Sequence, residues 1–248
     1  MTINKFVDSF LNIIPKEKWD FFSHIVANLS MPLISSPINF KYNGFTLKEF
    51  NINKDKNIQK KFIEFCYPLN MTNRHKEIEL DQYYWKNTST FIVFNKTNNI
   101  IGCMQFITKN KHNKIPFEFA NYTEHIGNTN YQLLYKASHG KHAEIYMYRC
   151  SLIGRELLSI SKMLFKACWV KIIQTKTEYV YLTYNYNNKE LYNLYTKRLF
   201  FLDPGICLYF KENKSKWHLL IKDCYLTEKK FATLNKNSFH LQTWFRKN

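Results

Sequence analysis

The period of the hydrophobic and polar positions changes several times along the chain, and each change marks an element. Between residues 142 and 200, the alternation over residues 143–149 predicts a strand, and a nearly all-apolar run after Gly154 predicts a long buried helix. A run rich in Tyr and Val, Tyr179–Asn185, predicts a second strand, and a final helix follows it. This order is a βαβα unit, which requires at least one parallel pair of strands.

Alternation elsewhere predicts five further strands, at residues 45–52, 90–94, 100–108, 206–210 and 217–221. Asn53 or Asp55 can cap a helix after the first of these, and Pro68 ends that helix. Residues 109–141 are poorly patterned, and a connection of that length is usually functional or mobile. We expect it to line or cover a substrate cleft and to contain a short helix at residues 131–136.

These elements predict an α/β (α+β) protein whose mixed central sheet is flanked by helices and spans residues 43–225. Residues 1–42 are expected to form an N-terminal helical arm, and residues 226–248 a basic, helical C-terminal tail. The first fourteen residues form an amphipathic pattern with no small-residue cleavage site after it. A helix packed on the domain is the favoured interpretation, and an anchor on a membrane surface is the alternative.

Composition narrows the class of protein. A hydrophobic content of 45% and an aromatic content of 17% exclude a disordered chain. No run approaches the roughly 20 apolar residues of a transmembrane helix, so none is expected. The six cysteines form no CxxC pair and the eight histidines form no HxxH pair, so no metal site is predicted. Buried thiols in a reducing compartment, the cytoplasm, are the default.

The net charge of +17 favours an acidic partner. Arginine occurs only at positions 74, 149, 155, 198 and 246, and the remaining positive charge is lysine scattered among asparagines. Surfaces that read nucleic-acid bases usually use arginine, so nucleic acid is the less favoured partner. A membrane surface and an acidic carrier protein stay open as well.

Glu144 is the first candidate for catalysis, because it stands on an otherwise apolar and aromatic strand. Strand alternation places Tyr146 and Tyr148 on its own face, where a carboxylate is poorly solvated. Poor solvation raises the pKa and suits a general base. The alternative is a carboxylate at the end of a sheet paired with a lysine.

Gly154 and Arg155 open the buried helix, and a helix N-terminus can bind a pyrophosphate or the phosphate of phosphopantetheine. Any strand-to-helix turn can contain such a pair, so the signal is weak. Asn185 ends the second strand, and Tyr195 lies two turns into the final helix. Its hydroxyl could protonate a leaving thiolate, although a packed tyrosine is the plainer reading in a chain with 17 tyrosines.

Several short segments resemble known acyltransferases. Residues 194–200 (LYTKRLF) resemble the closing LYEKxGF helix of the GNAT acyltransferase fold, with Leu199 where glycine is usual. Further segments resemble one branch of that superfamily, which comprises the autoinducer (acyl-homoserine-lactone) synthases, the N-acyl amino acid synthases and the exosortase-associated acyltransferases. They are KKFIEFC at 60–66 (LRYxVYC), ELDQYY at 79–84 (ExDxYD), IIGCMQ at 100–105 (vvGCxR), IPFE at 115–118 (lPxE) and AEIYM at 143–147 (aExSR).

The resemblance implies a GNAT-like fold and transfer of an acyl group to an amine by direct attack. The donor would be a thioester of coenzyme A or of the phosphopantetheine on an acidic acyl carrier protein, with no permanently bound cofactor. Glu144 would be the base and Tyr195 the acid. The residues implied on the donor side are Ile145, Met147, Arg149, Gly154, Arg155 and Asn185. A β-bulge in the central strand would splay it from its neighbour.

On the acceptor side the resemblance implies Glu79, Asp81, Gln105 and Lys61. Asp81 has an alternative structural role, which is to hold a basic residue such as Lys61.

The chain also departs from the pattern of this branch. Lys61, Gln105 and Met147 replace arginines, and Tyr84 replaces an acid. Loss of these groups argues against the homoserine-lactone reaction itself. Two hypotheses follow: a diverged acyltransferase with another amine acceptor, or an inactive GNAT-fold protein that binds nucleic acid or another acidic macromolecule through its basic surface.

Overall fold

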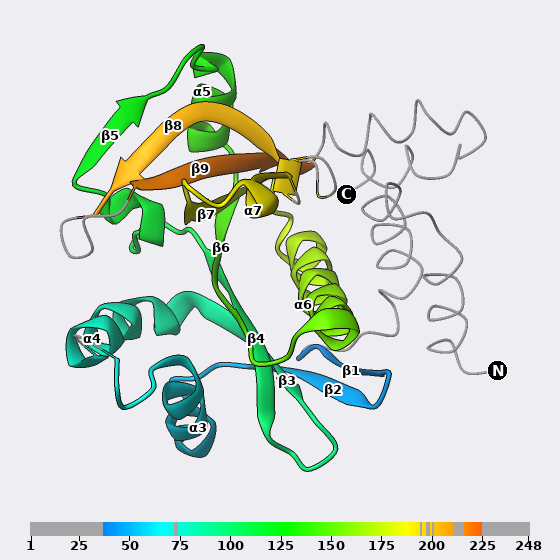
Figure 1. Cartoon of the computed structure of the whole chain (residues 1–248). Helices are drawn as coiled ribbons and strands as arrows, with labels where there is room; N and C mark the ends of the chain where they lie inside the picture. Colours follow the sequence, from blue (N-terminus) through cyan, green and yellow to red (C-terminus); the bar gives the residue numbers. More distant parts are fainter. Residues whose placement is uncertain are drawn as a thin grey trace, which may run out of the picture.

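The structure is a computed structural model that describes residues 37–71, 74–193, 195–196, 199, 201–210 and 216–224. Within these residues nine strands form one sheet in the order β1-β2-β3-β4-β6-β7-β9-β8-β5. The pair β6–β7 is parallel and every other pair is antiparallel. The predicted fold class, a mixed central sheet flanked by helices, is confirmed (Figure 1).

The predicted strands and helices within the described residues occur in the predicted order, whereas the helix at residues 74–84 was not predicted. The strands are β1 (Asn39–Tyr42), β2 (Phe45–Phe50), β3 (Thr88–Phe94), β4 (Ile100–Thr108), β5 (Tyr122–His125), β6 (His142–Cys150), β7 (Tyr179–Asn185), β8 (Leu202–Tyr209) and β9 (Lys216–Asp223). The helices are α3 (Lys56–Cys66), α4 (Arg74–Tyr84), α5 (Tyr131–His139), α6 (Gly154–Thr175) and α7 (Lys189–Asn193), with 3-10 turns η3 (Trp85–Asn87) and η4 (Pro116–Phe119).

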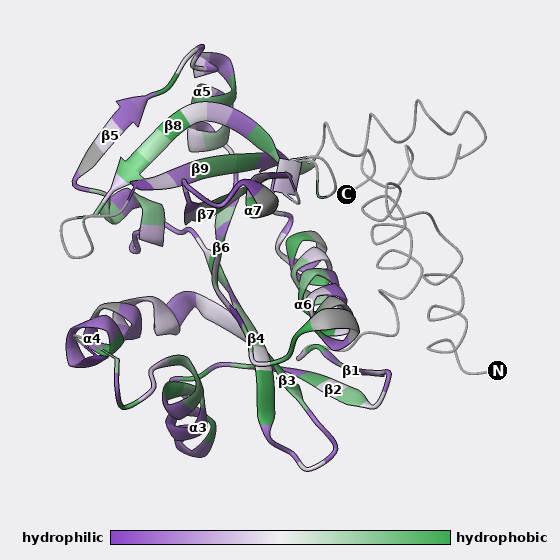
Figure 2. Ribbon diagram, in the orientation of Figure 1, coloured by the Kyte–Doolittle hydropathy of each residue, from purple (hydrophilic) through white to green (hydrophobic). Residues whose placement is uncertain are grey.

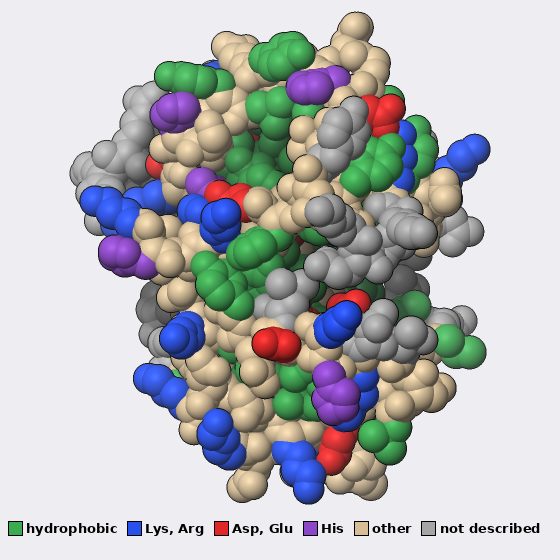
Figure 3. Space-filling model, turned by 90° about the vertical axis from the view of Figure 1, so that its left-hand side faces the viewer, with side chains coloured by type: hydrophobic (Ala, Val, Ile, Leu, Met, Phe, Trp, Pro, Cys, Tyr) green, Lys and Arg blue, Asp and Glu red, His purple; other side chains and the backbone are tan. Residues whose placement is uncertain are grey.

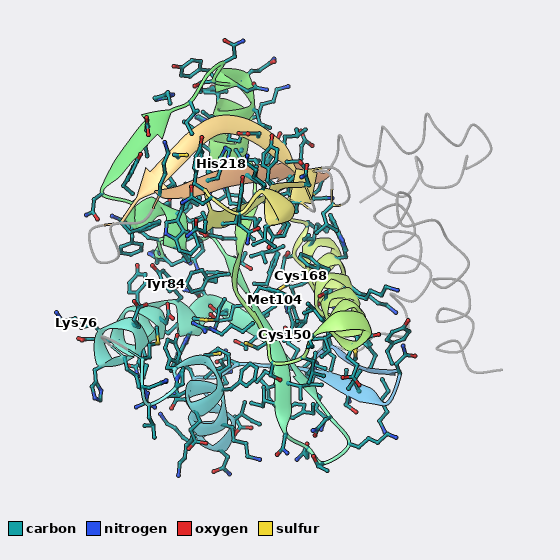
Figure 4. All side chains as sticks on the ribbon, in the orientation of Figure 1. Lys76, Tyr84, Met104, Cys150, Cys168 and His218 are labelled. Atoms are coloured by element: carbon teal, nitrogen blue, oxygen red, sulfur yellow. The ribbon has the colours of Figure 1, made fainter. Side chains whose placement is uncertain are left out.

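Helices lie on both faces of the sheet. The long helix α6 packs on one face, and α3 and α4 lie on the other (Figure 1). In the core beneath α6, Met104 of β4 and Cys168 of α6 point toward one another, with their sulfur atoms 3.1 Å apart (Figure 4). Polar residues predominate on the outer sides of α3 and α4, whereas β4 is strongly apolar (Figure 2). This layering makes β4 and β6 the centre of the molecule.

Strands β6 and β7 pair only at one end. Residues His142–Ile145 face Tyr179–Leu182, and beyond this point β6 pairs only with β4 while β7 pairs only with β9. A β-bulge lies at the point of separation, where Met147 has a φ of +53° and three residue steps of β6 span two steps of β4. The bulge and splay that the resemblance implied are therefore present.

Two parts of the chain differ from the expected organisation. Residues 39–42, expected to belong to the helical arm, form the edge strand β1, because Phe40 and Tyr42 pack on the core beneath α6. The connection at residues 109–141 contributes β5 to the far edge of the sheet as well as the expected helix α5. Residues 1–36 of the proposed arm and the proposed tail, residues 226–248, lie outside the described residues.

The predicted cap of α3 is Asp55, whose carboxylate accepts a hydrogen bond of 3.0 Å from the backbone N–H of Ile58. This bond begins the helix at the expected place. The apolar face of α3 buries Phe62 and Cys66 against β3 and β4, as the helical spacing predicted.

Candidate active site

Glu144 lies on β6 at the closed end of the splay and is fully buried. Its Oε2 atom accepts a hydrogen bond of 2.9 Å from the backbone N–H of Phe117, and among the described residues its Oε1 atom has no partner. Burial raises the pKa of Glu144 to about 8, the charge of Glu118 adds to the shift, and the hydrogen bond from Phe117 opposes it. The Glu144 carboxyl group is therefore mostly protonated at neutral pH, whereas an exposed glutamate is ionised there.

The turn η4 covers Glu144. Glu118 holds this turn in place, because its carboxylate accepts a bond of 2.7 Å from the backbone N–H of Ile115 and forms an ion pair of 2.7 Å with Lys109. The ring of Phe117 packs on Tyr181 of β7, with ring centroids 4.3 Å apart. The poorly patterned segment thus supplies the only described hydrogen bond to the Glu144 carboxyl group, and no sequence signal pointed to this backbone contact.

Asp81 lies on the same face of the sheet, at the C-terminal end of α4. It accepts hydrogen bonds from the hydroxyl groups of Tyr67 and Tyr146, the latter at 2.9 Å. Burial raises the pKa of Asp81 to about 6, although both tyrosine hydrogen bonds lower it. The alternative in which Asp81 holds Lys61 is wrong, because Lys61 is exposed on the outer side of α3 and two tyrosines take its place.

The other residues predicted on the acceptor side divide into two groups. Gln105 is fully buried on β4, opposite Tyr146, and its amide donates to the hydroxyl oxygen of Thr90 at 3.3 Å. Glu79 and Lys61 are exposed on α4 and α3. Asp81 and Gln105 therefore share the sheet face of Glu144, whereas Glu79 and Lys61 do not reach it.

Tyr84, which stands where the resembling branch has an acid, belongs to an aromatic cluster. Its ring lies 5.8 Å from Tyr146, 5.7 Å from Phe119 and 5.4 Å from Tyr83. Figure 4 shows Tyr84 pointing from the end of α4 toward the other half of the sheet. Aromatic rings therefore surround the position at which the resembling branch has an acid.

The bulge changes which face the residues after Tyr146 occupy. The expectation that Tyr148 shares the face of Glu144 is wrong, because its hydroxyl lies 2.7 Å from the Ser161 hydroxyl of α6 and its ring packs on Phe165. Arg149 lies opposite Cys103, which packs under α3, so Arg149 stands on the acceptor face. There it lowers the pKa of the nearby Asp81.

The remaining residues predicted for the donor surround the splay. Ile145 is the last residue of β6 that pairs with β7, and Gly154 begins α6 just beyond the open end. Arg155 follows it in α6, and its side chain is outside the described part of the structure. The side chain of Asn185 accepts a bond of 3.0 Å from the N–H of Asn187 and so closes the turn after β7.

Tyr195 is buried on the α6 face of the splay. Its ring lies 5.9 Å from Tyr184 and 6.2 Å from Phe201, and burial raises its pKa further above the ordinary value. In the described residues no side chain forms a hydrogen bond with its hydroxyl group. The structure therefore shows Tyr195 as a packed side chain in the core.

All six cysteines are free thiols. Five of the six cysteine side chains are buried, and no disulfide joins any of the six, all of which are described. The part of the chain that the structure describes holds no group of three His, Cys, Asp or Glu residues able to bind a metal ion. None of the described helices is long and apolar enough to cross a membrane.

Neither a protein-family model nor a curated protein matches this sequence. Among solved structures, it resembles the N-acyl amino acid synthase FeeM from uncultured soil microbes, at 12% identity over 71% of this chain and 89% of that chain, with a TM-score of 0.48. A chain of the NatC complex bound to Gag peptide and CoA is 13% identical over 72% and 98%, with a TM-score of 0.48. The spermidine/spermine N-acetyltransferase SpeG from Vibrio cholerae is 12% identical over 77% and 97%, with a TM-score of 0.46. Likeness at this level concerns the course of the backbone and assigns no residue a role.

Proposed function

We propose that this protein transfers an acyl group from a thioester donor to an amine by direct attack, without a covalent enzyme intermediate. The observation that carries the proposal is the fully buried Glu144 beside the splay of β6 and β7, with one carboxyl oxygen held and the other unpartnered among the described residues. A buried polar atom without a partner calls for one, and an amine N–H or a bridging water would supply it.

The roles follow from the chemistry of aminolysis. The amine attacks the thioester carbon and gives up a proton, which Glu144 takes directly or through one water. Because the pKa of Glu144 is about 8, its ionised form is a stronger base than an exposed glutamate. The hydrogen bond from the N–H of Phe117 holds the carboxyl group in one orientation. Glu144 is thus suited by both geometry and pKa to receive the proton.

The splay is the proposed donor site. Met147–Arg149 on β6 and Thr183–Asn185 on β7 have backbone groups that no strand of the described residues pairs across the gap. An extended pantetheine arm carries amide groups that can bond to such edges, in the manner of an added strand. The N-terminus of α6, which begins at Gly154 beyond the open end, would meet the phosphate groups.

The donor class is an acidic thioester, either acyl-coenzyme A or an acyl group on a carrier protein. The net charge of +17 would draw both toward the protein. The acceptor is proposed to be an amine that approaches from the face of α3 and α4. On the side where α4 and β5 lie, hydrophobic side chains gather at mid-height between the two halves of the molecule (Figure 3). Tyr83, which is 46% exposed, and the half-buried Phe119 belong to the aromatic cluster on this face.

The proposal is tested in two steps. Thermal shifts against coenzyme A, acyl-coenzyme A of several chain lengths and acyl carrier proteins identify the donor class. Thiol release is then followed with each donor that binds and a panel of amines. Absence of any stabilisation and of any thiol release would overturn the enzyme proposal.

Glu144→Gln is the decisive variant, because it keeps the shape of the side chain and removes the base. We expect donor binding to persist and transfer to slow by roughly 10²- to 10⁴-fold. Glu64→Gln, on the exposed side of α3, is the matched control and should transfer at the normal rate. Full activity of Glu144→Gln would remove Glu144 from the base role.

A further inference from the structure

Three side chains from neighbouring strands form a hydrogen-bonded chain on the α6 face of the splay, beneath α7. The hydroxyl of Tyr184 on β7 lies 2.7 Å from Nδ1 of His218 on β9, and Nε2 of His218 lies 3.0 Å from Oδ1 of Asp203 on β8. Tyr184 and His218 are 3% and 9% exposed. Figure 4 shows His218 in the upper half of the sheet, close to α7. The arrangement of a carboxylate, an imidazole and a hydroxyl in series is that of a proton relay.

Asp203 is held so that it fixes the imidazole. Its Oδ1 atom accepts a hydrogen bond of 2.8 Å from the backbone N–H of Gly205, and the hydroxyl of Tyr192 bonds to it as well. Partial burial disfavours its charge, but the bonds with His218 and Gly205 hold the pKa of Asp203 below its ordinary value. Asp203 is therefore an anion at neutral pH, and an anionic carboxylate can only accept a hydrogen bond.

This contact sets the tautomer of His218. Nε2 must carry the hydrogen that points at Asp203, so Nδ1 faces Tyr184 as an acceptor when the ring is neutral and as a donor when it is charged. In the charged state Tyr184 receives a hydrogen bond from Nδ1, and its own hydroxyl hydrogen is free to point to another acceptor. His218 can thus pass a proton to Tyr184 as Tyr184 gives one away.

The strand that carries Tyr184 borders the splay. Tyr184 lies on the part of β7 that has separated from β6, and its ring packs on Tyr195 at 5.9 Å. Tyr195 has no such chain behind it among the described side chains, whereas Tyr184 has His218 and Asp203. Burial raises the pKa of the Tyr184 hydroxyl, so a tyrosinate is costly unless a proton reaches it as it forms. His218 is placed to supply that proton.

We propose that Tyr184, rather than Tyr195, protonates the leaving thiolate of the donor, and that His218 and Asp203 are positioning residues that resupply its proton. This inference rests on the proposed acyl transfer. The amine nitrogen forms a bond to the thioester carbon, and the carbon–sulfur bond breaks with its electron pair on sulfur. The amine proton goes to Glu144, sulfur takes the Tyr184 hydroxyl proton, and Tyr184 takes the Nδ1 proton of His218. The products are an amide and a free thiol.

Solvent can recharge the relay at its outer end, because the side chain of Asp203 is 28% exposed and that of His218 is 11% exposed. The titratable groups that face His218 come from each element around it. They are Tyr184 and Tyr186 from β7 and its following turn, Tyr192 from α7, Asp203 and Cys207 from β8, and Lys216, whose amine lies over Tyr186.

The test compares two donors that differ in their leaving group. Octanoyl-coenzyme A releases an alkyl thiolate, which needs a proton, whereas S-(4-nitrophenyl) thiooctanoate releases an acidic aryl thiolate, which does not. Tyramine, spermidine and leucine serve as probe amines. For Tyr184→Phe we expect kcat with octanoyl-coenzyme A to fall by about 10²-fold with little change in KM, and the aryl thioester to be affected far less. His218→Gln should show the same selectivity between the two donors.

Tyr186→Phe is the matched control, since its ring packs 5.5 Å from the same imidazole and it lies outside the relay. It should transfer from both donors at the normal rate. Equal losses with both donors in Tyr184→Phe would indicate a structural role and overturn the relay, as would unchanged activity with octanoyl-coenzyme A. A wild-type protein that releases no thiol from any of the coenzyme A or carrier-protein donors with any amine would instead overturn the proposed function, and the relay with it.

Discussion

The burial of Glu144 leads to a prediction about stability that needs no substrate. In the folded protein its pKa is about 8, against an ordinary value of 4.5. Between these values the unfolded chain has lost the proton and the folded chain keeps it. Folding therefore takes up a proton in this range, and stability falls as the pH rises.

The magnitude follows from the size of the shift. One pKa unit corresponds to about 1.4 kcal/mol, so the free energy of unfolding should lose about 1.4 kcal/mol per pH unit between pH 4.5 and 8 through this group alone. The total loss of unfolding free energy is about 5 kcal/mol. This loss is absent below pH 4.5 and complete above pH 8. That is a large fraction of the roughly 5–15 kcal/mol that stabilises a typical protein.

Glu144→Gln removes the titration and keeps the shape, and its amide oxygen can still accept from the N–H of Phe117. The difference in the free energy of unfolding between the variant and the wild-type protein cancels the other titrating groups. Urea denaturation at pH 5, 6, 7 and 8 should show the variant gaining about 4 kcal/mol on the wild type across this range. Glu64→Gln, an exposed carboxylate on α3, should show a nearly constant difference.

A constant difference between Glu144→Gln and wild type from pH 5 to 8 would refute this reasoning. It would mean that Glu144 ionises in the folded protein as it does in water. The carboxyl group would then be solvated or paired, and the argument for its role as a base would lose its physical reason.

Three further predictions concern the reaction and the fold. Because the base form of Glu144 appears only as the pH rises through about 8, acyl transfer by the wild-type protein should increase through this pH, and Glu144→Gln should show no such rise. Asp55→Ala should lower the free energy of unfolding by about 1 kcal/mol in urea by removing the cap of α3, whereas Asp55→Asn should lose much less. Gly205→Ala should lower the free energy of unfolding by roughly 1–3 kcal/mol. Gly205 has a φ of +74°, and a Cβ there would lie 2.8 Å from the carbonyl oxygen of Ile126. A fall in Tm of less than about 2 °C would contradict this prediction.

The local pattern of the sequence determined most of the elements. The change of period around Gly154 placed β6, β7 and the start of α6 within one residue, because each element buries one face and the spacing of apolar residues follows from that burial. The cap at Asp55 could also be predicted from the sequence, since its hydrogen bond joins two residues only three positions apart. Edge strands β1 and β5 were missed because they are four residues each, too short for a period to show.

The tertiary structure decided which residues meet at the site. The bulge at Met147 adds one residue to β6 and reverses the faces of Tyr148 and Arg149, which simple alternation cannot anticipate. The partners of Asp81 likewise could not be predicted from the sequence, because Tyr67 reaches it from the end of α3 and Tyr146 from β6.

The chain from Tyr184 through His218 to Asp203 joins three strands through contacts that span 34 and 15 residues. Neither composition nor spacing marks such a set. A sequence records which side chains line each element, whereas a hydrogen-bonded site depends on how elements far apart in the chain are brought into register.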